Sequence, residues 1–267
     1  AQTTTGIRRL IYRVLSLGDR SVTPEAAKVD HWLIHKLAII GIPAACILHG
    51  YVGFLFGAVK ANPWWSTALM PIIFLASAIV SGVAALILLY QFLCWRRGSP
   101  ADADCVRAMT RSLWISLSIA FSLELLELIH MGYERHAEWH VIVHLLTERL
   151  WVSYGLIQVL IGSVVPFFLL MLAIQPWMNR RFMGFLSGLS SILVLIQVFA
   201  MRWNVVVGGQ MFSKSMRGFV EYPLHVWGRE GLIVGGVVLL LPLVVLFVGL
   251  KLFPWQTAET PGDATHA

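Results

Sequence analysis

Apolar residues dominate the chain in six long runs, and short polar stretches separate these runs. Each run is long enough for a helix to cross the hydrocarbon core of a bilayer, which takes roughly 20 residues. The pattern therefore predicts an all-α integral membrane protein. We expect a bundle of about six transmembrane helices, at approximately 31–57, 69–95, 112–132, 149–175, 183–202 and 230–253.

The composition supports this class. The chain has 267 residues, of which 58% are hydrophobic and 13% are charged, and its mean hydropathy is +0.75. A soluble domain of this length cannot bury so much apolar surface, whereas lipid can serve as its solvent. The net charge of +6 does not indicate nucleic-acid binding, because most basic residues flank apolar runs, where they orient helices. Cys46, Cys94 and Cys105 have no metal-ligand spacing, so neither a disulfide nor an iron–sulfur role is expected.

The polar segments indicate how the helices are oriented. Residues 1–30 are basic and polar and are predicted to be cytoplasmic or interfacial, with IRRLIYRVL favouring a helix on the membrane surface. Residues 254–267 are predicted to form a polar C-terminal tail. Lys and Arg residues are more numerous on the N-terminal side of the helices than on the other side. The positive-inside rule then places both termini in the cytoplasm and directs three long loops outwards, at 58–68, 133–148 and 203–229.

Polar residues gather near the outward ends of the predicted helices. The first, third and fifth helices run outwards, and the fourth and sixth begin at the outer side. Because of these directions, the polar residues at those ends fall into one layer. The layer contains His49, Glu124, Glu127, His130, Glu148, Arg149, Arg202, Asn204, Arg229 and Glu230.

The acids of this layer are candidates for proton chemistry. Glu124 and Glu127 are three residues apart and share a helix face, as do Glu127 and His130. An acid inside a membrane span is a functional candidate by default. A carboxyl group in an apolar setting is suited to taking up and releasing protons near neutral pH, and histidine does so without perturbation. A nearby arginine would favour the ionised carboxylate, so the balance depends on distances.

Structural interpretations remain open for several of these residues. Arg202 and Glu230 can form an interhelical ion pair instead of binding a ligand, and His49 can be a satisfied polar residue between helices. A histidine series with helical spacing permits a metal site, although an amphipathic helix at the outer interface is favoured; its members are His136, His140 and His144. His49 and His130 could also ligate a haem, which is a less favoured alternative.

Two stretches resemble a known family. LAIIGIPAACILHGYVGFLFGAVKANPWWSTALMPIIFLASAIVSGVAAL and RWNVVVGGQMFSKSMRG are similar to the NrfD/PsrC family of polysulfide-reductase membrane subunits. The resemblance covers about residues 30–253 and is most specific from His49 to Gly82 and around Arg202. The branch it resembles is the ten-helix group found in Hmc-type redox complexes, the sulfite-reductase-associated Dsr complex and the HybB subunit of hydrogenase-2.

The resemblance implies a quinol-interacting subunit of a respiratory complex in the bacterial inner membrane, typical of anaerobic respiration. Such a subunit carries no haem or metal. It exchanges electrons between menaquinone or ubiquinone and a periplasmic, ferredoxin-like iron–sulfur subunit, with further redox subunits and lipid as partners and no nucleic acid. By position, His49, Glu127, Arg202 and Glu230 match family residues that bind the quinone head group or handle its protons. The resemblance makes His49 and Glu127 the candidate catalytic pair. The candidate quinone-binding set is His49, Tyr51, Glu124, Glu127, His130, Arg202, Asn204 and Glu230.

One departure keeps other functions open. Members of the ten-helix branch carry about four further helices before the equivalent of residue 30, so this chain either lacks them or is the C-terminal part of a longer protein. The chain also begins with Ala1 rather than Met, as a processed protein or a fragment would. The alternatives are a purely structural anchor, a proton-conducting subunit and a b-type cytochrome. Few polar groups except His35 and Lys36 are expected in the inner half, which argues against a continuous proton path.

Overall fold

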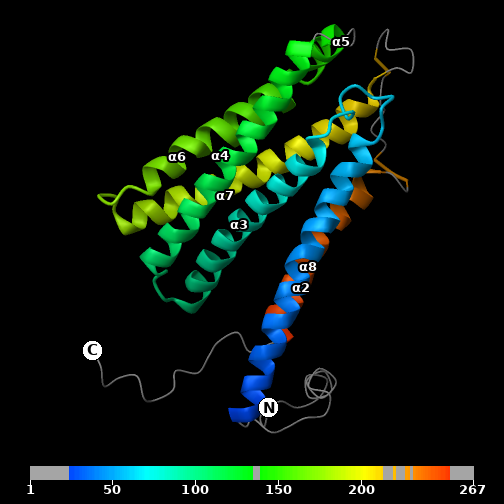
Figure 1. Ribbon diagram of the computed structural model, residues 1–267. Coiled ribbons are helices and arrows are strands. Elements are labelled where there is room, and N and C mark those ends of the chain that lie inside the picture. The colour runs from blue at the N-terminus through cyan, green and yellow to red at the C-terminus, as the bar shows by residue number, and fades with distance from the viewer. Residues whose placement is uncertain (1–23, 135–138, 213–218, 221–225, 229–230, 253–267) are drawn as a thin grey trace. The chain divides into compact units, whose positions relative to one another are not determined.

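The chain folds into helices, as the computed structural model shows for residues 24–134, 139–212, 219–220, 226–228 and 231–252 (Figure 1). Six stretches within these ranges are long and apolar enough to cross a membrane. This confirms the predicted all-α bundle of about six spans. The elements are α2 (Pro24–Gly57), α3 (Met70–Arg97), α4 (Ala103–Glu134), α5 (Trp139–His144), η1 (Leu145–Arg149), η2 (Trp151–Val164), α6 (Val165–Ala173), α7 (Arg180–Trp203), η3 (Asn204–Gly208) and α8 (Leu232–Leu252).

The chain divides into two compact units, and α2 crosses the boundary between them. One unit comprises residues 37–222, and the other comprises residues 1–36 and 223–267. In the second unit, α8 has a high apolar content and no buried residue. A helix that is apolar all round and not covered by protein is suited to contact with lipid.

The unit of residues 37–222 contains a bundle in which α7 packs against α3, α6 and η2, while α4 packs against α3 and α6 (Figure 1). Its centre is a cluster of buried side chains that includes Leu113, Leu117, Leu170 and Val194. Lipid tails are as apolar as these residues, so close packing rather than exclusion of water holds such helices together. The contact of α2 with α3 shows the same principle, because a Cβ at Gly53 would overlap the backbone of α3.

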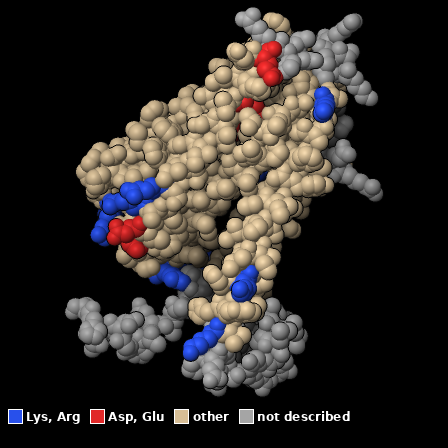
Figure 2. Space-filling model, viewed as in Figure 1, with Lys and Arg blue, Asp and Glu red and all other residues tan. Residues whose placement is uncertain are grey.

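Most of the bundle surface seen in Figure 2 carries no Lys, Arg, Asp or Glu side chain, and the charged side chains on it gather toward the bundle ends. Large apolar side chains such as Ile119 on α4 and Phe185 on α7 are exposed. In water such a surface would favour aggregation, whereas in a bilayer it faces hydrocarbon.

The ends of these helices follow from local sequence. Pro71 lies in the first turn of α3, where the missing N–H has no partner to lose. Gly98 ends α3 with φ of 71°, and its N–H bonds to the carbonyls of Cys94 and Trp95. The side chain of Asn179 caps α7 by accepting a hydrogen bond from the N–H of Arg181 at 3.2 Å.

Candidate functional site

Three π-helical segments, η1, η2 and η3, contribute to the part of the bundle that holds the polar layer. Such wide turns are rare and occur frequently at functional sites. In η2 the carbonyl of Gln158 accepts a hydrogen bond of 3.0 Å from the Ser163 hydroxyl, five residues further on. The segment ends where α6 begins with Pro166 in its first turn. Ser153, Tyr154 and Gln158 all lie on η2, so this wide helix supplies much of the site.

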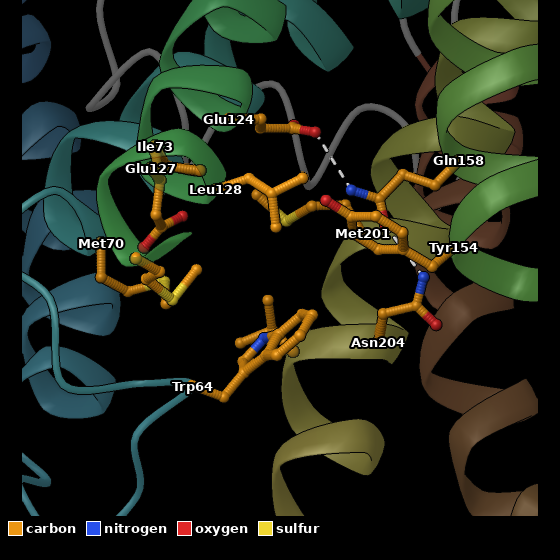
Figure 3. A pocket seen from close by; sticks show the side chains of 12 residues that line it. Trp64, Met70, Ile73, Glu124, Glu127, Leu128, Tyr154, Gln158, Met201 and Asn204 are labelled. Carbon is orange, nitrogen blue, oxygen red and sulfur yellow. Dashed lines mark hydrogen bonds between the residues drawn. The ribbon is translucent and has the colours of Figure 1, made fainter. Parts of the chain in front are cut away.

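A cavity of about 40 Å³ lies between α3, α4, η2, α7 and η3 (Figure 3). Its lining combines carboxyl, amide and phenol groups with thioether, aliphatic and indole side chains. The rings of Trp64 and Tyr154 meet edge to face, with centroids 6.0 Å apart. The lining residues are Trp64, Met70, Ile73, Glu124, Glu127, Leu128, Met131, Tyr154, Gln158, Met201, Asn204 and Val205.

Glu124 is held by amide groups from two helices. Gln158 donates to Oε2 at 3.0 Å, and Gln197 on α7 donates to Oε1 at 3.1 Å. The chain of bonds continues beyond Gln158, whose side-chain oxygen accepts a hydrogen bond from Asn204 at 2.8 Å. Asn204 in turn accepts a short hydrogen bond from the Ser153 hydroxyl. Both oxygens of Glu124 are therefore engaged.

Glu127, one turn further along α4, has a different environment. Its carboxyl group interacts with the hydroxyl of Thr67, which lies in the loop before α3. Its Oε1 atom is buried and has no hydrogen-bond partner. A buried polar atom without a partner costs about 1–3 kcal/mol, so this atom marks a position where a ligand or water would be stabilised. Figure 3 shows the Glu127 side chain directed toward Met70 at the edge of the cavity.

The loop of residues 58–69 contributes Trp64 to the cavity wall and is bonded to η3 and to the residue that follows it. The indole N–H of Trp65 donates to the carbonyl of Val205 at 2.6 Å, and the side chain of Asn62 donates to the carbonyl of Gly209 at 2.7 Å. A Cβ at Gly209 would overlap the indole of Trp65. The π-helical turn η3 and a glycine thus allow the loop to approach closely.

Arg202 lies two residues before Asn204, yet it contacts α3 rather than the cavity lining. Its guanidinium group lies over the ring of Phe74, 5.1 Å from the centroid, and donates to the Ser77 hydroxyl at 3.2 Å. A cation on an aromatic face is stabilised electrostatically, so this arrangement holds a charged group beside the pocket. The ion pair with Glu230 that the sequence suggested involves a residue outside those the structure describes.

The other candidate residues lie apart from the cavity lining. The Nδ1 atom of His49 on α2 is 2.9 Å from the carbonyl of Ala45, one turn earlier on the same helix. Tyr51 is 56% exposed. His130 is exposed, and its Nε2 is 3.5 Å from Glu134, one turn further along α4. Of the candidate set, the structure brings Glu124, Glu127 and Asn204 into one cavity, and Arg202 lies nearby on α7.

Several lining and bonding residues were missed by sequence reasoning. Gln158 and Gln197 are each the only strongly polar residue within an apolar stretch of helix, and a polar group inside a span needs a partner. That signal could have linked them to Glu124. Nothing in the sequence pattern marked Ser153, Tyr154 or Trp64 as part of the site.

The half of the bundle away from the cavity also contains polar groups. The hydroxyls of Thr110 and Ser187 are 2.8 Å apart, and the buried hydroxyl of Ser190 has no partner. Ser190 and Gln197 are seven residues apart on α7, or about 10 Å at the helical rise. The fully buried Val194 lies between them in the chain and belongs to the apolar core. Along α7, a fully buried apolar residue thus separates the two polar positions.

The described part of the chain has no group of three or more His, Cys, Asp or Glu side chains that could hold a metal ion. Within the histidine series considered above, His140 and His144 are exposed, and His144 Nδ1 is 3.0 Å from Glu148. His136 lies outside the described residues.

Comparison with known proteins gives one family. The family model described as polysulphide reductase, NrfD, matches residues 9–214. A selenate reductase subunit of Mesobacillus selenatarsenatis is 30% identical over 99% of this chain and 64% of its own length. Protein NrfD of Escherichia coli is 26% identical over 67% of this chain and 54% of its length. A putative dimethyl sulfoxide reductase membrane subunit of Halobacterium salinarum is 24% identical over 86% of this chain and 47% of its own length. The chain thus spans less than two thirds of the length of these curated relatives.

Proposed function

Because this chain belongs to the NrfD polysulphide reductase family, we propose that it is the quinol-interacting membrane subunit of a respiratory oxidoreductase complex. The family resemblance expected from the sequence is confirmed, and the ten-helix branch stays a prediction. In this role the chain exchanges electrons between menaquinone or ubiquinone and a periplasmic, ferredoxin-like iron–sulfur subunit. Two relatives bear the names of reductase subunits, which supports membership of such a complex. The proposal includes a bacterial inner-membrane location with both termini in the cytoplasm.

The observation that carries the proposal is the unpaired Oε1 atom of Glu127 beside the cavity. A quinol supplies two electrons, two protons and two ring hydroxyls when it is bound. The Glu127 carboxylate can accept a hydrogen bond from such a hydroxyl and take up its proton at Oε1, while the Thr67 hydroxyl holds the carboxyl group. Trp64 and Tyr154 provide aromatic wall beside this carboxyl.

The polar and aromatic residues of the cavity suit a quinone head group, but the cavity is too small to hold one. A water needs roughly 10–15 Å³, and benzene fills an engineered cavity of about 150 Å³ in another protein, so a cavity of about 40 Å³ admits water but not a ring. Met70, Met131 and Met201 line it, and methionine side chains rearrange at low cost. Ring binding therefore requires these thioether side chains to move.

His49 remains in the proposal as a second ring contact. A carbonyl oxygen only accepts, so the Nδ1 atom of His49 must donate to Ala45. In a neutral imidazole this leaves Nε2 as an acceptor, which suits a ring hydroxyl. Glu124, together with Arg202 stacked on Phe74, provides the other charged groups near the ring. Tyr51, His130 and Glu230 are included in the proposed binding set on the sequence alone.

The small cavity also favours one competing function, a structural anchor. In that case the chain only docks the redox subunits, and a quinone is handled in another part of the complex. The two functions differ in whether a ring contacts Glu127.

The test is a fluorescence-quench titration of the purified complex with heptyl-hydroxyquinoline N-oxide, a fluorescent quinol analogue. We expect saturable binding that weakens about tenfold or more in the Glu127→Gln variant, because the charged acceptor is lost. Asp104→Asn is the matched control, since Asp104 lies in the first turn of the same helix and is exposed. Tight binding unchanged by Glu127→Gln would favour the structural anchor.

A further inference from the structure

The hydrogen bonds that lead to Glu124 all point in one direction. An amide nitrogen can only donate, so Gln158 and Gln197 both treat Glu124 as an acceptor. The nitrogen of Asn204 donates to Gln158, and the hydroxyl of Ser153 donates to Asn204. These bonds form a row in which each member donates to the next, in the order Ser153, Asn204, Gln158, Glu124. This direction of donation, called the sense of the row below, matches an ionised carboxylate at its end.

Protonation of Glu124 at Oε2 conflicts with this sense. The new O–H would face the NH₂ group of Gln158, so one donor would meet another. Rotation of the Gln158 amide by a half turn solves the conflict there but sets its NH₂ group against that of Asn204. Asn204 must then rotate as well, and Ser153 must accept from it. With the proton on Oε2, only a reversal of the whole row keeps every hydrogen bond of the row.

We propose that Gln158, Asn204 and Ser153 are positioning residues that form a reversible relay, whose sense is set by the protonation of Glu124. The proton stays on the Glu124 carboxyl group, because the amides rotate and carry no proton along the row. Gln158 and Asn204 also line the cavity. When the row reverses, each amide rotates, and its oxygen and nitrogen atoms exchange places at the cavity wall. A ring carbonyl needs a donor and a ring hydroxyl needs an acceptor. Under the function proposed above, the relay makes the preference between oxidised and reduced rings depend on Glu124.

The surroundings of Glu124 leave few other groups to set its charge. Glu127 on the same helix and Tyr154 on η2 interact electrostatically with it. From α7, the neutral side chain of Gln197 reaches it, and Gly162 on η2 gives that side chain room because a Cβ there would overlap it. Gln197 holds the second oxygen and is not a member of the row, which makes it a matched reference for Gln158.

The experiment is a pH titration by infrared difference spectroscopy on the purified complex in lipid nanodiscs, without added quinone. Glu124→Gln identifies the carbonyl band of protonated Glu124 by its loss. Asn204 makes no hydrogen bond to Glu124 within the described residues, but it is the partner that fixes the orientation of the Gln158 amide. The Asn204→Leu variant removes that partner. We expect it to shift the pH at which the band appears by about one pH unit, a tenfold change in proton affinity.

Two double variants separate the relay from a direct effect of Asn204. In the Gln158→Leu background the shift caused by Asn204→Leu should vanish, and in the Gln197→Leu background it should persist. Equal shifts in both backgrounds, or no shift in any, would overturn the relay.

The unaltered protein provides a measurement that does not depend on variant folding. Its difference spectrum across Glu124 protonation should contain side-chain amide carbonyl bands, and their absence contradicts the reversal. None of these readouts requires a bound ring. A failure of the quinol-analogue titration is therefore distinguishable from a failure of the relay.

Discussion

The two sides of the cavity treat their carboxyl groups in opposite ways, although Glu124 and Glu127 are only three residues apart on α4. On the side of η2 and α7, two amides saturate Glu124, and further bonded residues hold one of them in place. On the loop side, Glu127 meets the hydroxyl of Thr67 and keeps one buried oxygen unpaired. The difference teaches that neighbouring elements, rather than residue type or helix face, decide which of two acids is available to a ligand.

Glu127→Gln gives the largest expected effect on this contrast. It preserves the shape of the side chain and removes proton exchange on the open side of the cavity. We expect quinol-dependent reduction of the partner to fall by about 100-fold or more, since a positioned acid or base contributes on the order of 100- to 10,000-fold. Steady-state oxidation of a short-chain quinol by the purified complex measures it. Activity retained at the level of the Asp104→Asn control would make Glu127 a structural residue.

Gln197→Leu tests the saturated side. The variant keeps the side-chain volume similar but removes a hydrogen bond to Glu124, which contributes about 1.5–3 kcal/mol when the acceptor is charged. We expect lower stability, measured by thermal unfolding of the detergent-solubilised protein. Gln175→Leu serves as control, because Gln175 is half-buried near the end of the α6 span and its side chain donates to the carbonyl of Met171, one turn earlier, at 3.2 Å. An equal loss of thermal stability in both variants would show that the hydrogen bond to Glu124 contributes no more than an ordinary side-chain hydrogen bond.

Gly162→Ala tests whether close packing sustains that bond. The added methyl group would overlap the side chain of Gln197 and push it away from Glu124. Overpacking of this kind costs about 1–3 kcal/mol, and the same unfolding assay reports it. Gly184→Ala is the contrasting change, since its Cβ meets nothing within 4 Å and alanine is favoured over glycine in a helix by about 0.5–1 kcal/mol. A stable Gly162→Ala protein would mean that Gln197 adapts.

Thr67→Val should give the smallest effect. It removes the hydroxyl that interacts with Glu127 while keeping the branched shape. A single hydrogen bond of this kind contributes about 0.5–1.5 kcal/mol, so kcat/KM for a quinol should change by roughly tenfold or less. Thr147→Val, whose hydroxyl bonds to its own helix at 2.8 Å, should leave kcat/KM unchanged. An effect as large as that of Glu127→Gln would place Thr67 among the residues that contact the ring.

Hydropathy was sufficient to predict an all-α chain with about six long apolar helices, because membrane crossing demands long apolar runs whatever the tertiary contacts. The helix period also placed Glu124 and Glu127 on one face, and both line the cavity. What the period could not provide is the neighbours across helices. Gln158 reaches Glu124 from a π-helical segment, whose wider turn alters the direction of side chains and has no signature in the sequence.

The same limit applies to the charged and aromatic candidates. Arg202 and Asn204 are two residues apart, so they point in different directions on a helix, and only Asn204 lines the cavity. His130 shares a helix face with Glu127 but lies nearer the end of α4, where it is exposed beside Glu134. Proximity in sequence thus did not decide which of these residues line the cavity.

The contact between Trp65 and Gly209 has a consequence for interpreting related sequences. A tryptophan ring occupies the space where any other residue at position 209 would place its Cβ. A relative with a tryptophan aligned to Trp65 should therefore keep glycine at the aligned position. A relative with a larger residue there must route the loop before its second span differently. The presence of both this tryptophan and this glycine in an aligned sequence thus indicates that a homologue shares the covered cavity.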